Sequence, residues 1–222
     1  MITKSSDNWV NEPGGFDALN SFYLPDLTEL GIPIIERQDV SIPERAVSYT
    51  HRGRTTKDHI HFFLDDYRFE SVWKYPVRCA KALAGFTAAS PDFSVFYDWP
   101  LPLQIWNVYR SRWCGSFWQQ YGITVVPTIS WGDSRSYGFC FDGIETGSAV
   151  WISTVGIRLG DRDKFRSGFD AMIDAIAPEI VLCYGEFAPV YGRMMERVVC
   201  FEYIFGRQVS RIMTTSAPGI VD

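Results

Sequence analysis

Residues 149–184, AVWISTVGIRLGDRDKFRSGFDAMIDAIAPEIVLCY, decide the fold class, because two short apolar runs flank one amphipathic segment. The runs 149–155 and 180–184 have the length and composition of buried strands. Between them, apolar side chains recur at helical spacing, namely Phe165, Phe169, Met172, Ile173 and Ile176. Pro178 stops this predicted helix, which spans 163–177. A strand–helix–strand unit of this kind pairs its two strands in parallel.

The same alternation extends toward the N-terminus. Residues 61–66 and 93–98 are predicted strands that each end in Asp, and residues 101–121 are a predicted helix that a glycine closes. Residues 123–129 follow as another strand. Pro127 cannot donate to a strand ladder, so this strand is either bulged or ends earlier than its apolar pattern indicates.

These elements predict a fold of the α/β class. Residues 32–36 are a further expected strand, and 191–205 is either a helix or a helix followed by a strand. Because the strand count is short of eight, we expect a mainly parallel sheet with strand–helix alternation, either a partial or irregular TIM-like barrel or an open sheet. Residues 1–30 are polar and are expected to form an N-terminal arm packed on the domain, and 31–222 to form a single α/β domain.

The composition limits the kinds of partner that the protein is expected to bind. The apolar fraction of 46% excludes a disordered chain, and the net charge of −5 argues against generic binding of duplex DNA. The N-terminus has no apolar leader, and no run reaches the about 18 apolar residues of a membrane span. We therefore expect a cytoplasmic protein, with a small molecule or a protein as its partner and no membrane.

Carboxylates follow most of the predicted strands. In parallel α/β folds the residues after each strand converge at one edge of the sheet, where binding sites are built. The catalytic candidates chosen on this basis are Asp65, Asp66, Asp98, Asp142 and Glu186. The candidates for substrate binding are Arg110, Trp99, Trp131, Ser153 and Thr154. The plainer alternative is that Asp and Glu favour loops and helix N-termini in any protein.

Two arginines of the predicted helix 101–121 fall on or beside its apolar face. A buried guanidinium must be paired, so Arg112 is expected to contact a carboxylate or several backbone carbonyls. A carboxylate partner would be Asp98 or one of Asp65 and Asp66. Arg110, at the edge of that face, is the candidate for contact with an anion.

The sequence supports few cofactors. Mg²⁺ is possible at clustered carboxylates, whereas His59 and His61 come before the apolar residues of the predicted strand and so lie at its wrong end for a metal site. The chain has no GxGxxG or Walker motif, so neither NAD nor Walker-type ATP binding has a signature. The five cysteines include no CxxC pair, which excludes a zinc ribbon.

Several segments together resemble a known family. They are PDFSVFYDWP at 91–100, QIWNVYRSRW at 104–113, VPT at 126–128, FCFDGI at 139–144 and STVG at 153–156. In these segments, over about residues 60–186, the chain resembles bacterial, phage and mobile-element proteins grouped as a domain of unknown function. The resemblance implies a phage or integrative-element setting, and a phage-encoded protein of this kind is expected in the host cytoplasm. It brings no activity and no residue roles.

Two classes of function follow. The first is an enzyme whose acidic site at the strand edge acts on a phosphate-bearing substrate, with Arg110 as anion partner, or on a sugar, with Asp98 and Glu186 as acid–base pair. The second is a non-catalytic interaction protein that acts on host or phage machinery, using its surplus aromatic side chains at an interface.

Overall fold

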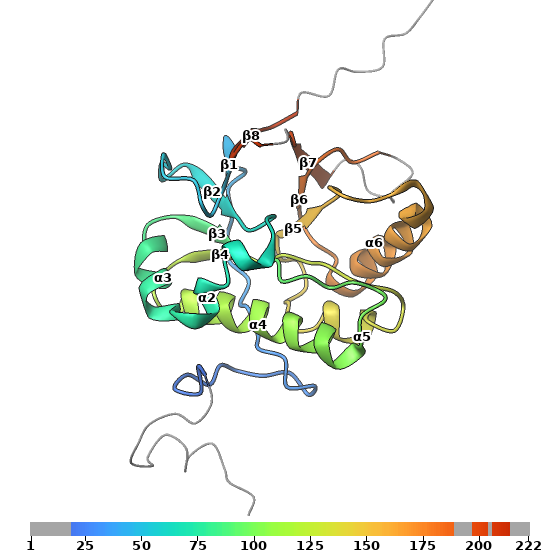
Figure 1. Cartoon of the computed structure of the whole chain (residues 1–222), viewed down its shortest axis with the longest axis horizontal. Helices are drawn as coiled ribbons and strands as arrows, with labels where there is room; N and C mark the ends of the chain where they lie inside the picture. The colour runs from blue at the N-terminus through green and yellow to red at the C-terminus, as the bar shows by residue number, and fades with distance from the viewer. Residues whose placement is uncertain (1–18, 189–196, 204–205, 214–222) are drawn as a thin grey trace, which may run out of the picture.

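The computed structural model describes residues 19–188, 197–203 and 206–213, in which strands and helices alternate along the chain (Figure 1). In chain order the elements are β1 (Arg45–Ser48), β2 (Asp58–His61), η1 (Asp66–Arg68), α2 (Ser71–Lys74), α3 (Pro76–Leu83), β3 (Thr87–Ala89), α4 (Leu101–Gln119), β4 (Thr124–Val126), α5 (Tyr137–Cys140), β5 (Val150–Ser153), η2 (Leu159–Asp161), α6 (Arg162–Ile176), β6 (Val181–Tyr184), β7 (Val198–Phe201) and β8 (Val209–Arg211).

The strands form two sheets. The larger has the order β4-β3-β2-β1-β8, in which β1 to β4 are parallel and β8 is antiparallel to β1. The smaller has the order β5-β6-β7 and is parallel throughout. Single bridges, Thr128 with Trp151 and Phe201 with Ile212, connect the two sheets, so the ladders of the described residues do not run on into a closed barrel. The predicted α/β class with a mainly parallel arrangement is confirmed.

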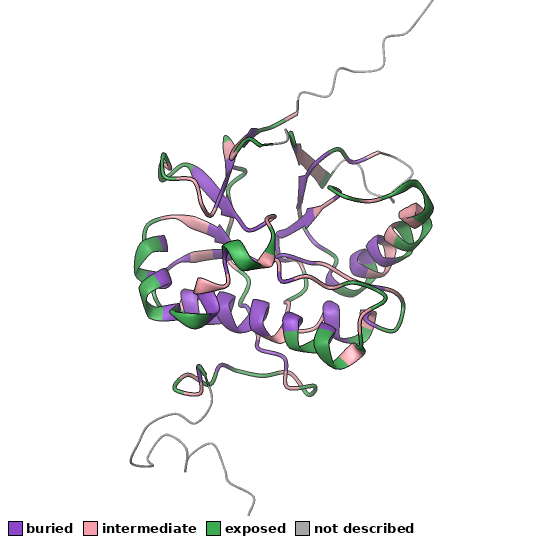
Figure 2. Cartoon of the chain, viewed as in Figure 1, coloured by how far each residue is buried: buried purple, intermediate pink, exposed green. Residues whose placement is uncertain are grey.

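Helices cover each sheet on its outer side. Helices α2, α3 and α4 lie along the larger sheet and α6 lies against the smaller one, with their buried faces turned inward (Figures 1 and 2). The expected amphipathic helix is α6, which buries the predicted Phe169, Met172, Ile173 and Ile176 against β5 and β6. All four residues of β6 are buried, as the apolar run predicted.

Some strand boundaries differ from the sequence expectation. Strand β4 ends at Val126, directly before Pro127, which agrees with the early end that the proline indicated. The predicted strand 61–66 is wrong, because strand β2 is Asp58–His61 and ends where the prediction began. His59 and His61 therefore lie toward the carboxyl end of the strand, and not at the opposite end as expected. The expected strand 32–36 is wrong, because these residues contribute only two single bridges, Pro33 with Leu27 and Ile35 with Ile144.

The predicted strand 93–98 is wrong. The strand that enters the sheet is β3, Thr87–Ala89, between β2 and β4. Side chains form the hydrogen bonds of the Ser94 backbone. Asp66 accepts a hydrogen bond from the Ser94 N–H at 3.1 Å, and Asn107 Nδ2 donates to the Ser94 carbonyl at 2.7 Å. Because these partners replace a neighbouring strand, residues 93–98 run outside the ladder.

Arg112 is buried on α4, as its position on the helix predicted. Its guanidinium donates to the carbonyls of Asp142 at 3.2 Å, Thr128 at 3.0 Å and Cys140 at 2.7 Å. Burial lowers the pKa of Arg112 to about 10, and the group remains a cation at neutral pH. The backbone carbonyls, rather than Asp65, Asp66 or Asp98, are therefore its partners.

The described part of the expected N-terminal arm contacts α4. Trp113 Nε1 donates to the carbonyl of Tyr23 at 3.1 Å, and the ring of Phe22 meets those of Trp113 and Phe117 edge-on. The other part of the expected arm, residues 1–18, lies outside the described residues, as do 191–196 and 204–205 of the predicted segment 191–205. In the part of the chain that the structure describes, no helix is both long and apolar enough to cross a bilayer.

Candidate functional site

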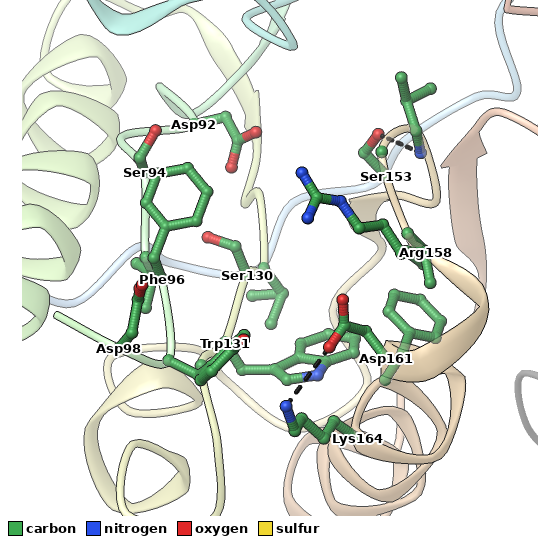
Figure 3. Close-up of a pocket in the computed structure, with 18 residues that line it drawn as sticks. Asp92, Ser94, Phe96, Asp98, Ser130, Trp131, Ser153, Arg158, Asp161 and Lys164 are labelled. Atoms are coloured by element: carbon green, nitrogen blue, oxygen red, sulfur yellow. Dashed lines mark hydrogen bonds and ion pairs between the residues drawn. The ribbon is translucent and has the colours of Figure 1, made fainter.

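A pocket of about 530 Å³ lies where the chain leaves β3, β4 and β5 at their carboxyl ends (Figure 3). The segments after these three strands supply most of its wall, and the start of α6 supplies the remainder. Its polar lining residues are Asp92, Ser94, Asp98, Ser130, Ser153, Arg158, Asp161 and Lys164. The volume falls within the range of about 300–1,000 Å³ that is typical of small-molecule sites.

Asp92 is the most perturbed acid of this pocket. Burial, together with the negative charge of Asp66, raises the pKa of its carboxyl to about 7, although a hydrogen bond from Ser130 acts in the opposite direction. Asp66 itself accepts hydrogen bonds from the Ser94 hydroxyl at 2.8 Å and the Ser94 N–H at 3.1 Å. At neutral pH a large fraction of Asp92 therefore carries a proton that it can donate.

A network on α4 holds the Ser94 segment in place. Asn107, which binds the Ser94 carbonyl, accepts a hydrogen bond from Arg110 Nη2 at 2.7 Å. Arg110 also pairs with Glu70 at 3.0 Å and lies 3.8 Å from the ring centre of Phe93. Arg110 thus supports the wall of the pocket from behind and does not line it.

Two cations stand on the wall opposite Asp92. Lys164 Nζ is 3.3 Å from an oxygen of Asp161 and 3.7 Å from the ring centre of Tyr97. Figure 3 shows the guanidinium of Arg158 pointing into the pocket. Within the described residues, the Arg158 side chain forms no ion pair or hydrogen bond. Arg158 is therefore available to an anionic ligand.

The loop after β5 is shaped by close local contacts. Ser153 Oγ accepts from the N–H of Val155 at 3.1 Å and donates to the carbonyl of Tyr184 at 3.2 Å. Gly156 follows with a φ of +88°, a left-handed conformation that few residues other than glycine adopt. The turn at Gly156 lets the chain reverse and bring Arg158 to the pocket.

Trp131 forms the floor of the pocket and depends on a glycine of α6. A Cβ added at Gly168 would lie 2.0 Å from Trp131 Nε1, so only glycine lets the indole lie this close to the helix. The Trp131 ring also contacts that of Phe165 at a centroid distance of 5.0 Å. Side chains of α6 thus fix the orientation of the indole.

Some of the predicted site residues line this pocket, and others do not. Asp98, Trp131 and Ser153 line it, and Asp66 lies just behind it through Ser94. Six predicted residues do not line it, namely Asp65, Trp99, Arg110, Asp142, Thr154 and Glu186. Asp142 instead accepts a hydrogen bond from Thr28 at 2.5 Å, and Thr154 donates to the Glu186 carbonyl at 2.8 Å.

Sequence reasoning did not find Asp92, Arg158, Asp161 or Lys164. The assumed strand 93–98 placed Asp92 before a strand instead of after one, and a strand ending at Ala89 would have selected it. Arg158 and Asp161 belong to the loop before α6, which carries no motif. Only the position of that loop over the sheet edge brings these charges to Asp92.

The described residues form no cluster of side chains suited to bind a metal ion. Among them, no group of three or more His, Cys, Asp or Glu side chains is arranged to hold one. His59 and His61 point into the core, where the His61 ring lies 4.5 Å from that of Tyr184. Burial lowers the pKa of His59 to about 4 and that of His61 to about 3.

The fold and the pocket define an α/β protein with a polar and aromatic cavity at the carboxyl edge of its parallel strands. The chain belongs to the family described as Domain of unknown function (DUF4417), whose model matches residues 25–203. It is 42% identical over 193 residues to the Gene 1 protein of Mycobacterium phage L5, covering 83% of this chain and 84% of that protein. The Gene 1 protein of Mycobacterium phage D29 is 41% identical over 192 residues, with 82% of this chain and 71% of that protein covered. No solved structure matches the chain. The resemblance seen in the sequence is therefore confirmed.

Proposed function

We propose that the pocket at the edge of β3, β4 and β5 binds a small phosphate-bearing molecule, to which Asp92 donates a proton. One observation carries the proposal: the guanidinium of Arg158 faces the cavity without a partner among the described residues, opposite a carboxyl whose pKa is raised to about 7. A cation and a neutral acid on facing walls form the donor set that phosphate oxygens require. Guanidinium groups in particular bind phosphate through two parallel hydrogen bonds.

The remaining lining residues fit the same class of ligand. The hydroxyls of Ser94 and Ser130 line the cavity beside Asp92 and hold the two acids in place, because Ser94 donates to Asp66 and Ser130 donates to Asp92. The aromatic side chains of Phe96 and Trp131 give the cavity an apolar surface for the organic part of the ligand. A purely inorganic anion would leave that surface uncovered.

A sugar substrate is supported less well. The expected acid–base pair was Asp98 and Glu186, but Glu186 does not line the cavity. An acid and a base on either side of a glycosidic bond would have to share one pocket. The phosphate-bearing class is therefore the better candidate for an enzymatic or a binding role at this site.

Two ligands that differ by one phosphate test the proposal. We expect adenosine monophosphate to raise the melting temperature more than adenosine, because binding to the native state stabilises it. Arg158→Gln should remove the difference, and the exposed Arg52→Gln, which makes the same change in charge elsewhere, should keep it. Raising the pH from 6 to 8 should weaken the effect, since Asp92 loses its proton in this range and its charge then repels phosphate.

Two results would contradict the proposal. The first is an equal response to both ligands, or no response to either. The second is a preference for the monophosphate that survives in Arg158→Gln. Isothermal titration calorimetry on the same proteins provides the affinity, and release of inorganic phosphate distinguishes turnover from binding alone.

A further inference from the structure

A second cavity lies on another part of the surface, between the chain segment that precedes β1 and the helices α2 and α3. It has a volume of about 790 Å³. Leu19 and Phe22 form one wall, and Tyr75 and Val77 form the other. Leu19 is 56% exposed and Tyr75 is 59% exposed, so large apolar side chains flank an open groove. Nothing in the phosphate-binding proposal uses this groove.

The wall formed by residues 19–22 is held in a fixed position. Asn20 is buried, has a left-handed φ of 67°, and donates from its side-chain amide to the carbonyl of Trp73 at 2.8 Å. The ring of Phe22 rests edge-on against that of Trp113, with the centroids 6.0 Å apart. Because both walls are fixed before any partner arrives, the groove loses little conformational entropy when it is filled.

The groove is also basic, in a chain whose net charge is −5. Lys74, Arg78 and Lys81 line it, and in the described part of the chain none of the three is engaged in an ion pair. Arg78 and Lys81 are three residues apart on α3 and so stand on the same side of the helix, where like charges repel. A negatively charged partner would remove this repulsion.

We propose that this groove docks a segment of a partner protein that is both apolar and acidic, with the chemistry of an acidic amphipathic helix. Its apolar side chains would enter between Phe22 and Tyr75, and its carboxylates would face Arg78 and Lys81. Helices that lay an apolar face into such a groove are a recurring mode of peptide recognition. Charge complementarity selects an acidic segment over a basic one. The sequence suggested a non-catalytic protein that uses surplus aromatic side chains at an interface. The groove is the surface that we assign to such an interface.

A pair of synthetic peptides tests the proposal on the full chain. The first is a fluorescein-labelled helix of about 16 residues with Leu at positions i, i+3, i+4 and i+7 and Glu on its flanks. The second carries Lys in place of every Glu. We expect fluorescence anisotropy to show binding of the acidic peptide, with the basic peptide at least about tenfold weaker, which corresponds to about 1.4 kcal/mol.

Charge reversal in the protein provides the matched control. The triple variant Lys74→Glu, Arg78→Glu, Lys81→Glu should bind the acidic peptide at least about tenfold more weakly. The triple variant Arg52→Glu, Lys57→Glu, Arg211→Glu makes the same change in net charge at exposed positions outside the groove and should bind as the wild type does. Val77→Asp should weaken binding without any loss of positive charge.

Four outcomes would overturn the proposal. The first three are failure of the acidic peptide to bind, equal binding of both peptides, and an equal loss of peptide affinity in both triple variants. The fourth is displacement of the peptide by single-stranded DNA, which would assign the groove to a phosphate polyanion. A photo-crosslinker placed at Val77 tests whether the chain fills the groove itself. If it captures residues 1–18 of the same chain and the peptide does not bind, the proposal of a partner protein is likewise refuted.

Discussion

Replacing Asp92 by Asn should stabilise the protein, and the gain should grow with pH. In the folded protein the pKa of Asp92 is raised to about 7 from its ordinary value of 3.8. The folded state therefore favours the protonated carboxyl. Stability from this group is complete below pH 3.8 and is lost as the pH rises through 7. Asn cannot ionise, so the variant escapes that loss.

The size of the effect follows from the two pKa values. Each unit of pKa difference corresponds to about 1.36 kcal/mol, so the largest loss above pH 8 is about 4 kcal/mol. Between pH 5 and pH 8.5 the loss grows by at most about 2.7 kcal/mol. Asp92 keeps some contact with solvent through the pocket, which screens its charge. We therefore expect the gain from Asp92→Asn to be about 1–2.5 kcal/mol larger at pH 8.5 than at pH 5.

Urea unfolding of both proteins at the two pH values measures this difference. Comparison at a common pH is essential, because His59 and His61 have lowered pKa values and make the protein less stable as the pH falls below 6.5. That contribution is common to the wild type and the variant and cancels. The exposed Asp39→Asn should show no pH-dependent gain. A gain for Asp92→Asn that is constant with pH, or is larger at pH 5, would refute the burial of this carboxyl as the cause.

Three further predictions concern stability and reactivity. Arg112→Ala should lower the free energy of unfolding by about 3–5 kcal/mol, because it leaves three carbonyls without their donor, two of them buried. A loss below about 1 kcal/mol in urea unfolding would contradict a stabilising role of those bonds. Gly168→Ala should displace the indole of Trp131 and shift the tryptophan fluorescence, whereas Gly138→Ala, with open space around its Cβ, should not. Cys200 should be alkylated by iodoacetamide at pH 7 faster than the other cysteines, because a hydrogen bond from the Cys183 thiol on β6 lowers the pKa of Cys200 to about 7. Peptide mass spectrometry that finds equal alkylation of the cysteines would contradict this prediction.

The sequence alone determined the elements whose signal lies within a few consecutive turns. Helix α6 and strand β6 follow from apolar spacing and a terminating proline, since residues 162–184 carry the whole pattern. The burial of Arg112 follows in the same way from its position on α4. The family was likewise visible in the segments between 91 and 156, and the family match includes all of them.

Only the tertiary structure decided which segment became β3 and which residues meet in the pocket. Thr87–Ala89 carries little apolar signal, but it lies between β2 and β4, which provide the partners for its backbone groups. The more apolar residues 93–98 instead form a pocket wall, because Asp66 and Asn107 satisfy the backbone at Ser94. Arg158 comes to face Asp92 across the sheet edge, although 65 residues separate them in the sequence. Local patterns specify local elements, whereas strand pairing and converging charges depend on segments that meet only in the folded chain.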